Sequence, residues 1–454
     1  MMRKKLLAGV LAVTLACSAL VGCGGSGGSE QSSGENSNGK IELSLWSTYT
    51  TESTTKFNEL VAKFNAENEN YEVKVEAGLG EDQTRQKLTT VDKEFFPAMF
   101  MGTDSSIFEY SDASYVQPVQ NFLNEDNEDW LAGMLDSVKT AYSDKDGNLV
   151  GMPIGVSVKG YMVNLDVLAQ TGYTLDDLTS FEKVAAAATA AKDKGASQYG
   201  YVPSSGVEIM DMLLYQGVDI FDGDNGHSGE ITKCMYTEGE TLEALKKMAE
   251  IYADMFKSGV AVENSSGPDS YASVFTSGKT LFWSCTSSYV YEFENVNVNF
   301  EWAFMPFKGV DDNAEHQNTV MPEGTGIFIA NSGDEKKMQG AYEFIKFLAR
   351  PENQLFWSTF RGYTPYTEEA LSSQEWITWR DENYPSEAKI EEMLKAGNEA
   401  LHFPNTSIIG KLGNTNTQII SSIIENPDAD LEEIIKTATE NINQSIKILQ
   451  LRGQ

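Results

Sequence analysis

The segment "IELSLWSTYTTESTTKFNELVAKFNAENENYEVKVE", residues 41–76, indicates the fold class of the chain. Residues 41–46 alternate apolar and polar side chains, which is the two-residue period of a β-strand. Apolar side chains then recur at helical spacing from Phe57 to Phe64, and residues 71–75 alternate again. The order strand, helix, strand predicts two parallel strands joined by a crossover helix, and therefore a protein of the α/β class.

Further strands and helices follow along the chain. Apolar runs predict strands at residues 95–102, 280–285 and 324–331. Amphipathic or Ala-rich stretches predict helices at residues 181–194, 242–256, 341–350 and 431–449. The pair Asp146-Gly147 predicts a hairpin turn, and the strand-like segment 150–163 after it leads into a helix.

The first 22 residues have the composition of a secretory signal. Three basic residues at positions 3–5 precede an uncharged, mostly apolar run over residues 6–22. An uncleaved membrane anchor is the alternative, because about 17 to 25 apolar residues can span a bilayer. The sequence Leu20-Val21-Gly22-Cys23 resembles the lipobox of bacterial lipoproteins, in which the Cys sulfur is acylated and the chain is cut before it. We therefore predict a signal peptide over residues 1–22 and lipidation of Cys23.

Residues 23–40 are predicted to be the lipidated Cys and a flexible tether. After Cys23 they consist almost entirely of Gly, Ser, Asn and acidic residues. Such a coil has a root-mean-square reach of roughly 20–25 Å, and two acyl chains anchor a protein stably. The expected location is the cell surface, with the protein lipid-anchored to the outer face of the cytoplasmic membrane.

Length and charge limit the remaining possibilities. About 430 residues follow the predicted cleavage site, which favours two lobes over a single core. The net charge is -33, and it becomes -36 without the three basic residues of the leader. A body this acidic repels phosphate backbones, so a nucleic-acid partner is not expected.

The cysteines and histidines indicate neither a disulfide scaffold nor a zinc site. Only Cys234 and Cys285 remain beyond the lipobox, and the sequence leaves open whether they pair. The three histidines are scattered and no Cys-x-x-Cys occurs. Asp144 and Asp146 imitate the start of a calcium loop, but no Glu completes the pattern, so a plain turn is the better interpretation. No metal or cofactor is predicted.

Four segments together resemble a known family. They are residues 41–76, "VGMPIGVSVKGYMVNLDVLAQTGY" (150–173), "VFTSGKTLFWSCTSSYV" (274–290) and "GAYEFIKFLARPENQLFWSTFRGYTPYTEEAL" (340–371). Their order, with the lipobox and the tether, is similar to that of the extracellular solute-binding proteins of ABC importers, in the group that serves sugars and glycerol phosphates.

The resemblance implies a two-lobed, periplasmic-binding-protein-like α/β fold with a ligand cleft that closes like a hinge. Each lobe would be discontinuous. Lobe 1 would comprise residues 41–153 plus 325–360, and lobe 2 residues 154–324 plus 361–454. The implied function is to capture a carbohydrate, an oligosaccharide by expectation, and to deliver it to ABC permease subunits. The protein is expected to be a monomer and not an enzyme.

Candidate ligand residues follow from the chemistry of sugars, whose flat faces stack on aromatic rings and whose hydroxyls bind carboxylates and amides. In the first lobe the resemblance favours Trp46 and Tyr49, on the loop after the first strand. Thr103 and Asp104 follow a predicted strand, and parallel strands present ligand residues at their carboxyl ends. Core packing is the alternative for Trp46, and helix capping is the alternative for Asp104.

Other candidates come from the later segments. They are Ser204, Glu208, Ser287, Tyr289, Gly324, Thr325, Tyr363 and Phe403. A glycine lets a ligand approach the backbone closely. For Glu208 the alternative is a solvated helix face, and for Tyr363 and Phe403 it is ordinary packing.

Two other functions compete with carbohydrate binding. Relatives that bind glycerol phosphates generally use an Arg near the segment "ALHFPNTSII" (400–409), where this chain has His402 and Phe403; Arg361 and Arg380 are the later candidates for an anion. A lipid-anchored glycoside hydrolase would need two carboxylates at about 5–5.5 Å or 6.5–9.5 Å. With 67 acidic residues the sequence does not single out such a pair, and no Gly-x-Ser-x-Gly or His-Glu-x-x-His motif occurs.

Overall fold

The computed structural model describes residues 39–123, 129–204, 206, 208–262, 268–289, 293, 296–316, 319–396, 401 and 403–452. The predicted signal peptide, Cys23 and most of the predicted tether lie outside these residues. Within the described part of the chain, no helix is long and apolar enough to cross a membrane.

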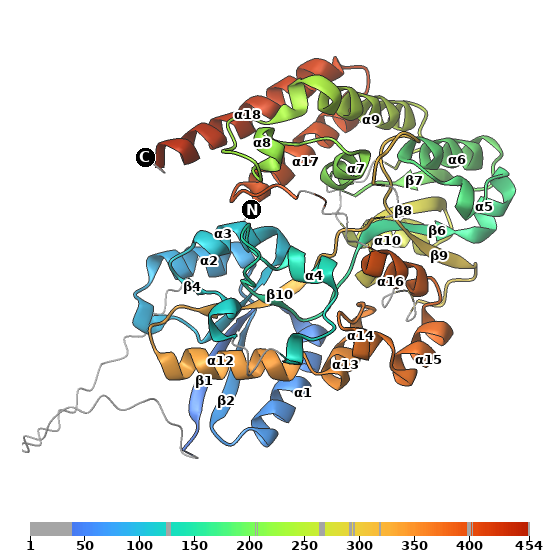
Figure 1. Cartoon of the computed structure of the whole chain (residues 1–454). Coiled ribbons are helices and arrows are strands. Elements are labelled where there is room, and N and C mark those ends of the chain that lie inside the picture. The colour runs from blue at the N-terminus through green and yellow to red at the C-terminus, as the bar shows by residue number, and fades with distance from the viewer. Residues whose placement is uncertain are drawn as a thin grey trace, which may run out of the picture.

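The first sheet is built from two distant parts of the chain (Figure 1). Its strands run in the order β2-β1-β3-β10-β4, and β5 also pairs with β10. Their bounds are β1 Ile41–Ser47, β2 Tyr71–Ala77, β3 Met99–Thr103, β4 Val116–Gln117, β5 Met152–Pro153 and β10 Thr325–Ala330. Strand β1 is parallel to β2 and β3, and β10 is antiparallel to β3. The parallel unit predicted at residues 41–76 is confirmed, with helix α1 (Thr51–Glu67) as its crossover.

The second sheet has the order β7-β8-β6-β9. Its strands are β6 Lys159–Asn164, β7 Tyr199–Val202, β8 Thr280–Thr286 and β9 Trp302–Pro306. Strand β8 is parallel to β7 and antiparallel to β6, which also pairs antiparallel with β9. Helices α6 (Phe181–Asp193), α9 (Gly239–Lys257), α17 (Ile409–Glu425) and α18 (Leu431–Arg452) contribute to the hydrophobic cluster around this sheet. The two sheets and their helices form two lobes, which confirms the predicted fold (Figure 1).

The remaining helices complete the two lobes. They are α2 Glu81–Thr90, α3 Ile107–Asp112, α4 Asp136–Ala141, α5 Leu165–Thr171, α7 Glu208–Gln216, α8 Asp222–Asn225, α10 Pro268–Thr276, α12 Glu335–Leu348, α13 Pro351–Arg361, α14 Glu368–Leu371, α15 Gln374–Asn383 and α16 Glu387–Ala396. Short 3-10 turns also occur, and two of them, η2 (Asp104–Ser106) and η7 (Ser287–Tyr289), lie beside the cleft.

The lobes are joined by crossing segments. Val156 pairs with Thr364 and Ser157 pairs with Glu323, so three separate stretches of chain run side by side between the two sheets. Buried residues from Tyr363 to Leu394 belong to the hydrophobic cluster around the first sheet, which also includes Trp283 and Phe304 from the second sheet. The predicted lobe boundary at residues 360/361 therefore stays a prediction, because α14–α16 pack where the lobes meet.

Several element bounds differ from the sequence predictions for local reasons. Strand β3 begins at Met99 rather than at residue 95, because Phe95 lies in a 3-10 turn and Pro97 cannot donate to a ladder. Helix α12 begins earlier than predicted because the side chain of Asp334 accepts hydrogen bonds from the N–H groups of Lys336 and Lys337. The predicted strand 150–163 divides into β5 and β6.

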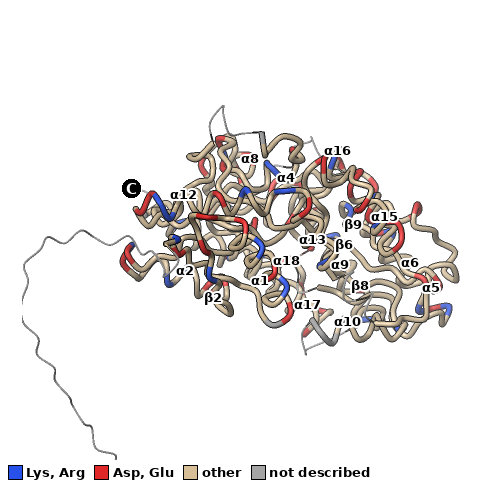
Figure 2. The backbone as a smooth tube through the Cα atoms, turned by 90° about the horizontal axis from the view of Figure 1, so that it is seen from below, with Lys and Arg blue, Asp and Glu red and all other residues tan. Residues whose placement is uncertain are grey.

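The net negative charge is distributed over both lobes. Figure 2 shows acidic residues around most of the outline of the molecule, including α2 and α12 in the first lobe and α5 in the second. The net charge of the chain therefore does not indicate the charge of the cleft, which depends on the side chains that line it.

Candidate functional site

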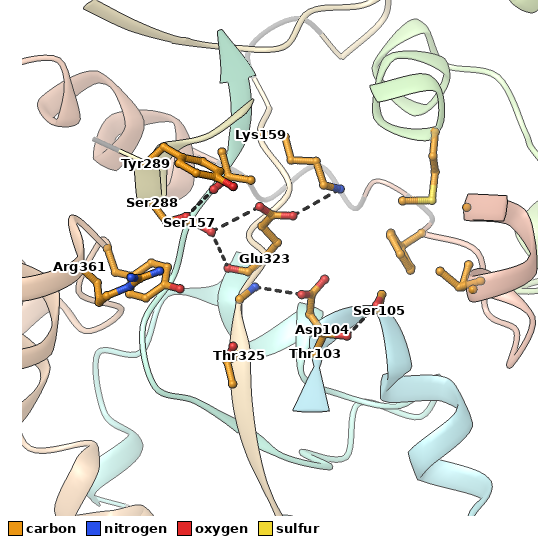
Figure 3. A pocket seen from close by; sticks show the side chains of 18 of the residues that line it. Thr103, Asp104, Ser105, Ser157, Lys159, Ser288, Tyr289, Glu323, Thr325 and Arg361 are labelled. Atoms are coloured by element: carbon orange, nitrogen blue, oxygen red, sulfur yellow. Dashed lines mark hydrogen bonds and ion pairs between the residues drawn. The ribbon is translucent and has the colours of Figure 1, made fainter. Parts of the chain in front are cut away.

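A cavity of about 510 Å³ opens between the lobes. Its wall is formed by the carboxyl end of β3 with η2, the start of β6, the turn η7, residues 323–325, the end of α13 and the first turns of α17 (Figure 3). These elements come from both lobes and from the crossing segments. A ligand bound here would contact both lobes and the crossing segments.

Seven of the residues predicted from the sequence line this cavity. They are Thr103, Asp104, Tyr289, Gly324, Thr325, Tyr363 and Phe403, and Arg361 lies beside them. Thr103 and Asp104 reach the cavity as expected, because β3 ends there next to the parallel strand β1. The Gly155 backbone lies directly beneath Tyr363, since a Cβ on residue 155 would be 3.0 Å from that side chain.

Trp46 and Tyr49 are not part of the lining. Trp46 is buried, and the amine of Lys87 lies 3.7 Å from its ring centroid. The ring of Tyr49 packs on Trp357 with a centroid distance of 5.2 Å. Both side chains therefore contribute to the first hydrophobic cluster, and their predicted ligand roles receive no support from their position.

Ser204, Glu208 and Ser287 also lie off the cavity wall. Glu208 is fully buried and accepts hydrogen bonds from the hydroxyls of Ser204 and Tyr252, the latter at 2.5 Å. Ser287 is buried as well, and its hydroxyl oxygen accepts a hydrogen bond of 3.1 Å from the N–H of Val158. These polar groups hold the second lobe together, and their binding roles stay predictions.

A buried ion cluster includes two residues of the cavity wall, Lys159 and Glu323, whose ion pair is visible in Figure 3. The amine of Lys159 lies 3.1 Å from Asp211 Oδ1 and 3.5 Å from Glu323 Oε2. The side chains of Lys159 and Asp211 are 15% and 1% exposed. Burial raises the pKa of Asp211 to about 6, although the charge of Lys159 lowers it in part. These three residues were not predicted from the sequence, in which the available signal was a lysine at the start of a mostly apolar strand.

Asp104 connects the first lobe to the crossing segment. Its Oδ1 accepts a hydrogen bond of 2.9 Å from the N–H of Gly324, and its own N–H donates to the Gly324 carbonyl at 3.3 Å. Burial raises the pKa of Asp104 to about 7, and the nearby charge of Glu323 adds to this effect. Asp104 is therefore a carboxyl group that can both donate and accept near neutral pH.

This raised pKa predicts a pH effect on stability. The native state keeps the Asp104 proton up to about pH 7, whereas the unfolded chain loses it near 3.8, so Asp104 lowers the free energy of unfolding as the pH rises through that window. Asp104→Asn removes the titration. We expect the free energy of unfolding of Asp104→Asn, minus that of wild type, to increase by about 2 kcal/mol from pH 5 to pH 8. Urea denaturation at both pH values measures this, and a difference that does not change with pH would contradict it.

Glu81 positions the loop that carries Thr103 and Asp104. At the start of α2, its carboxylate accepts hydrogen bonds from the Thr103 hydroxyl (3.0 Å), the Ser106 hydroxyl (2.6 Å) and the Tyr110 hydroxyl (2.8 Å). The N–H of Thr103 also donates to it at 3.3 Å. One carboxylate thus fixes both ends of η2. Sequence reasoning missed Glu81 because an acidic residue in a first helical turn is typical of any helix.

A second cavity, of about 630 Å³, adjoins the first. The two cavities share Asp104, Lys159, Glu323 and Phe403. The second is otherwise lined by the α4 region, the hairpin near Gly147, residues 319–322, His227, Leu401 and Phe108.

Neither a metal cluster nor a disulfide occurs in the described part of the chain. Across these residues there is no group of three His, Cys, Asp or Glu side chains that could hold a metal ion. Residues 144–148 form the predicted turn, in which Asp144 Oδ1 accepts from the N–H groups of Asp146 and Asn148. Cys234 and Cys285 are both buried and do not form a disulfide with each other, which answers the question of their pairing.

The chain is similar in sequence to known bacterial proteins. The family model described as bacterial extracellular solute-binding protein matches residues 59–385. A curated relative, the sn-glycerol-3-phosphate-binding periplasmic protein of Yersinia pestis, is 22% identical over 284 residues, which are 62% of this chain and 63% of the relative. The Escherichia coli K12 protein of the same description is 21% identical over 374 residues, or 78% of this chain and 80% of that protein. The chain thus spans less than two thirds of the Yersinia relative's length.

Solved structures of sugar-binding proteins share the fold. The cyclic alpha-maltosyl-1,6-maltose binding protein of Arthrobacter globiformis aligns with a TM-score of 0.68 at 18% identity, covering 90% of this chain and 100% of that one. The maltotriose binding protein of Thermus thermophilus also gives 0.68 at 18% identity, covering 89% and 100%. At these identities the likeness extends to the fold alone.

Proposed function

The chain belongs to the bacterial extracellular solute-binding proteins, and from this membership we propose that it captures a carbohydrate between its lobes and delivers it to an ABC permease. The observation that carries the proposal is the composition of the interlobe cavity. Tyr289, Tyr363 and Phe403 provide aromatic surface, while Asp104 and Glu323 provide carboxyl oxygens. Sugars need this combination, because each ring has a flat apolar face and a rim of hydroxyls.

Closure of the cleft accounts for capture and release. The cavity wall comes from both lobes, so a bound sugar contacts more protein in a closed state than in an open one. A ligand shifts a conformational equilibrium by its difference in affinity for the two states. The closed form would then present surfaces of both lobes to the permease.

Binding of a glycerol phosphate is the second candidate. Arg361 lines the cavity, and its Nε is buried without a hydrogen-bond partner among the described residues. An anionic group would satisfy this donor. Against this candidate, Lys159 is already paired with Asp211 and Glu323, and a phosphate near them would face the carboxyl groups of Glu323 and Asp104. The charge distribution therefore favours a neutral sugar.

A thermal-shift screen distinguishes these ligands. We expect at least one oligosaccharide to raise the melting temperature of the purified chain, since a ligand at 100 times its Kd stabilises the native state by about 2.7 kcal/mol. The panel should include neutral sugars, glycerol 3-phosphate and short peptides. Stabilisation by glycerol 3-phosphate and by no sugar would contradict the carbohydrate proposal.

We also propose that the chain binds its ligand without chemical change, as a monomer. Incubation of the chain with the stabilising oligosaccharide, followed by chromatography, would show cleaved product if the hydrolase alternative were correct. We further propose that Cys23 carries the lipid that holds this extracellular protein at the membrane. The mass of the mature protein tests this, because a diacylated N-terminal Cys would replace the first 22 residues.

A further inference from the structure

We infer that the second cavity is an extension of the carbohydrate site, and that an oligosaccharide reaches through it from the ion cluster to the aromatic pair Phe108–Phe403. This inference rests on the proposed function. It adds a part of the site through which the affinity depends on the length of the ligand.

The two cavities are parts of one cleft. Asp104, Lys159, Glu323 and Phe403 belong to the walls of both. Their volumes are about 510 and 630 Å³, and a single small-ligand site typically measures about 300–1,000 Å³. Each cavity alone could thus hold a small sugar. Because Lys159 and Glu323 line both cavities, one longer chain of sugars can occupy both.

The second cavity has its own aromatic platform. Phe108 comes from α3 in the first lobe and Phe403 from the segment before α17 in the second. Their ring centroids lie 6.5 Å apart, and the ring planes differ by 19°. Both side chains remain partly exposed although they stack on each other, so apolar ring surface faces the cavity. Such surface suits the flat face of a sugar ring.

Contacts within the second lobe hold Phe403 in place. Its carbonyl lies 2.8 Å from Nε2 of His227, and the N–H of Asn405 donates to the Asn225 carbonyl at 2.8 Å. The Phe403 end of the platform is therefore fixed to the second lobe by its own carbonyl and by the backbone of Asn405. Phe108, on α3, completes the pair from the opposite lobe.

Polar groups line other parts of the second cavity. Lys139, Thr140 and Ser143 line the cavity at the end of α4, and Thr319 lines it from the segment before the crossing. Hydroxyl and amine groups beside aromatic surface are what sugar hydroxyls require. The second cavity therefore repeats the chemistry of the first.

Calorimetric titration of the purified full-length chain tests the inference. The probes are three series of linear oligosaccharides from two to six units: maltose to maltohexaose, cellobiose to cellohexaose, and xylobiose to xylohexaose. In the series that binds, we expect the Kd to fall with length beyond two units. Phe108→Ala should raise the Kd of the longer members about fivefold and leave the disaccharide within twofold of wild type.

Two further variants complete the design. Phe95→Ala is the matched control, because Phe95 is 65% exposed and lines neither cavity. It should change no Kd. Phe108→Leu keeps an apolar side chain but removes the flat ring, and it should show the same length dependence as Phe108→Ala if the ring face binds sugar.

Each contrary result has its own meaning. A Kd that is equal for every length, or a loss of affinity in Phe108→Ala that is equal for every length, would overturn the extended site and assign the aromatic pair to closure of the lobes. No binding by any series would overturn the proposed function, and the inference would fall with it.

Discussion

Lys159→Met is expected to lower the free energy of unfolding by about 3–5 kcal/mol, which is typical when one partner of a buried ion pair is removed. The methionine fills a similar volume, but it leaves Asp211 and Glu323 without their cation. Asp211 has almost no contact with solvent, so water cannot replace the lost charge. Urea denaturation followed by circular dichroism measures the change.

The pH dependence of this loss identifies its cause. The pKa values of Asp104 and Asp211 are raised to about 7 and about 6, so both carboxyls are largely protonated at pH 5 even with Lys159 present. The deficit of Lys159→Met should therefore be smaller at pH 5 than at pH 8. Lys389→Met is the control, because its ion pair with Glu392 is 63% and 69% exposed and should contribute less than about 1 kcal/mol. A loss in Lys159→Met no larger than in this control would contradict the interpretation.

Gly324→Ala is expected to lower the free energy of unfolding by about 3 kcal/mol and to raise the Kd for the proposed sugar ligand by more than tenfold. A Cβ at residue 324 would lie 2.6 Å from the carbonyl oxygen of Gly155, and this oxygen belongs to the backbone of a neighbouring crossing segment. The backbone of Gly324 also holds Asp104, and its carbonyl accepts a hydrogen bond of 2.9 Å from the Tyr142 hydroxyl. Any shift that relieves the overlap moves these cavity groups.

Gly333→Ala is the control for a positive-φ glycine outside the cavity. Gly333 has a φ of +77° and Gly324 a φ of +156°, and no atom lies within 4 Å of the position that a Cβ on Gly333 would take, so Gly333→Ala introduces no overlap. We expect Gly333→Ala to lower the free energy of unfolding by about 1 kcal/mol and to leave the Kd unchanged. Calorimetry and thermal denaturation of the two variants provide the comparison. A similar Kd in both would mean that Gly324 does not organise the cavity.

The sequence predicted those elements whose pattern is complete within a few turns of chain. The period of apolar residues from Ile41 to Val75 is local, and the β1-α1-β2 unit formed as predicted. Strand β7 was missed because Gly200 resembles a loop residue. In the structure, a Cβ on Gly200 would lie 2.2 Å from the Ala188 carbonyl, so this glycine permits close packing of α6 on the strand.

The site was predictable where topology alone positions a residue. Thr103 and Asp104 follow a strand end, and strand ends converge at one edge of a sheet. Trp46 also ends a strand, but α2 covers it through Lys87, a contact that no local pattern indicates. Lys159, Asp211 and Glu323 were not predicted, because they are distant in sequence and isolated charged residues usually lie on the surface.

The position of β10 in the first sheet has a consequence for the way the chain folds. Thr325 pairs with Thr103, so β3 can pair with β10 only after most of the polypeptide has been synthesised. Pairing over such a sequence separation slows folding, because the long loop must close before its contacts form. The predicted signal peptide implies export, and a chain that folds slowly would still be unfolded when it crosses the membrane. The discontinuous lobe thus suits export as well as ligand capture.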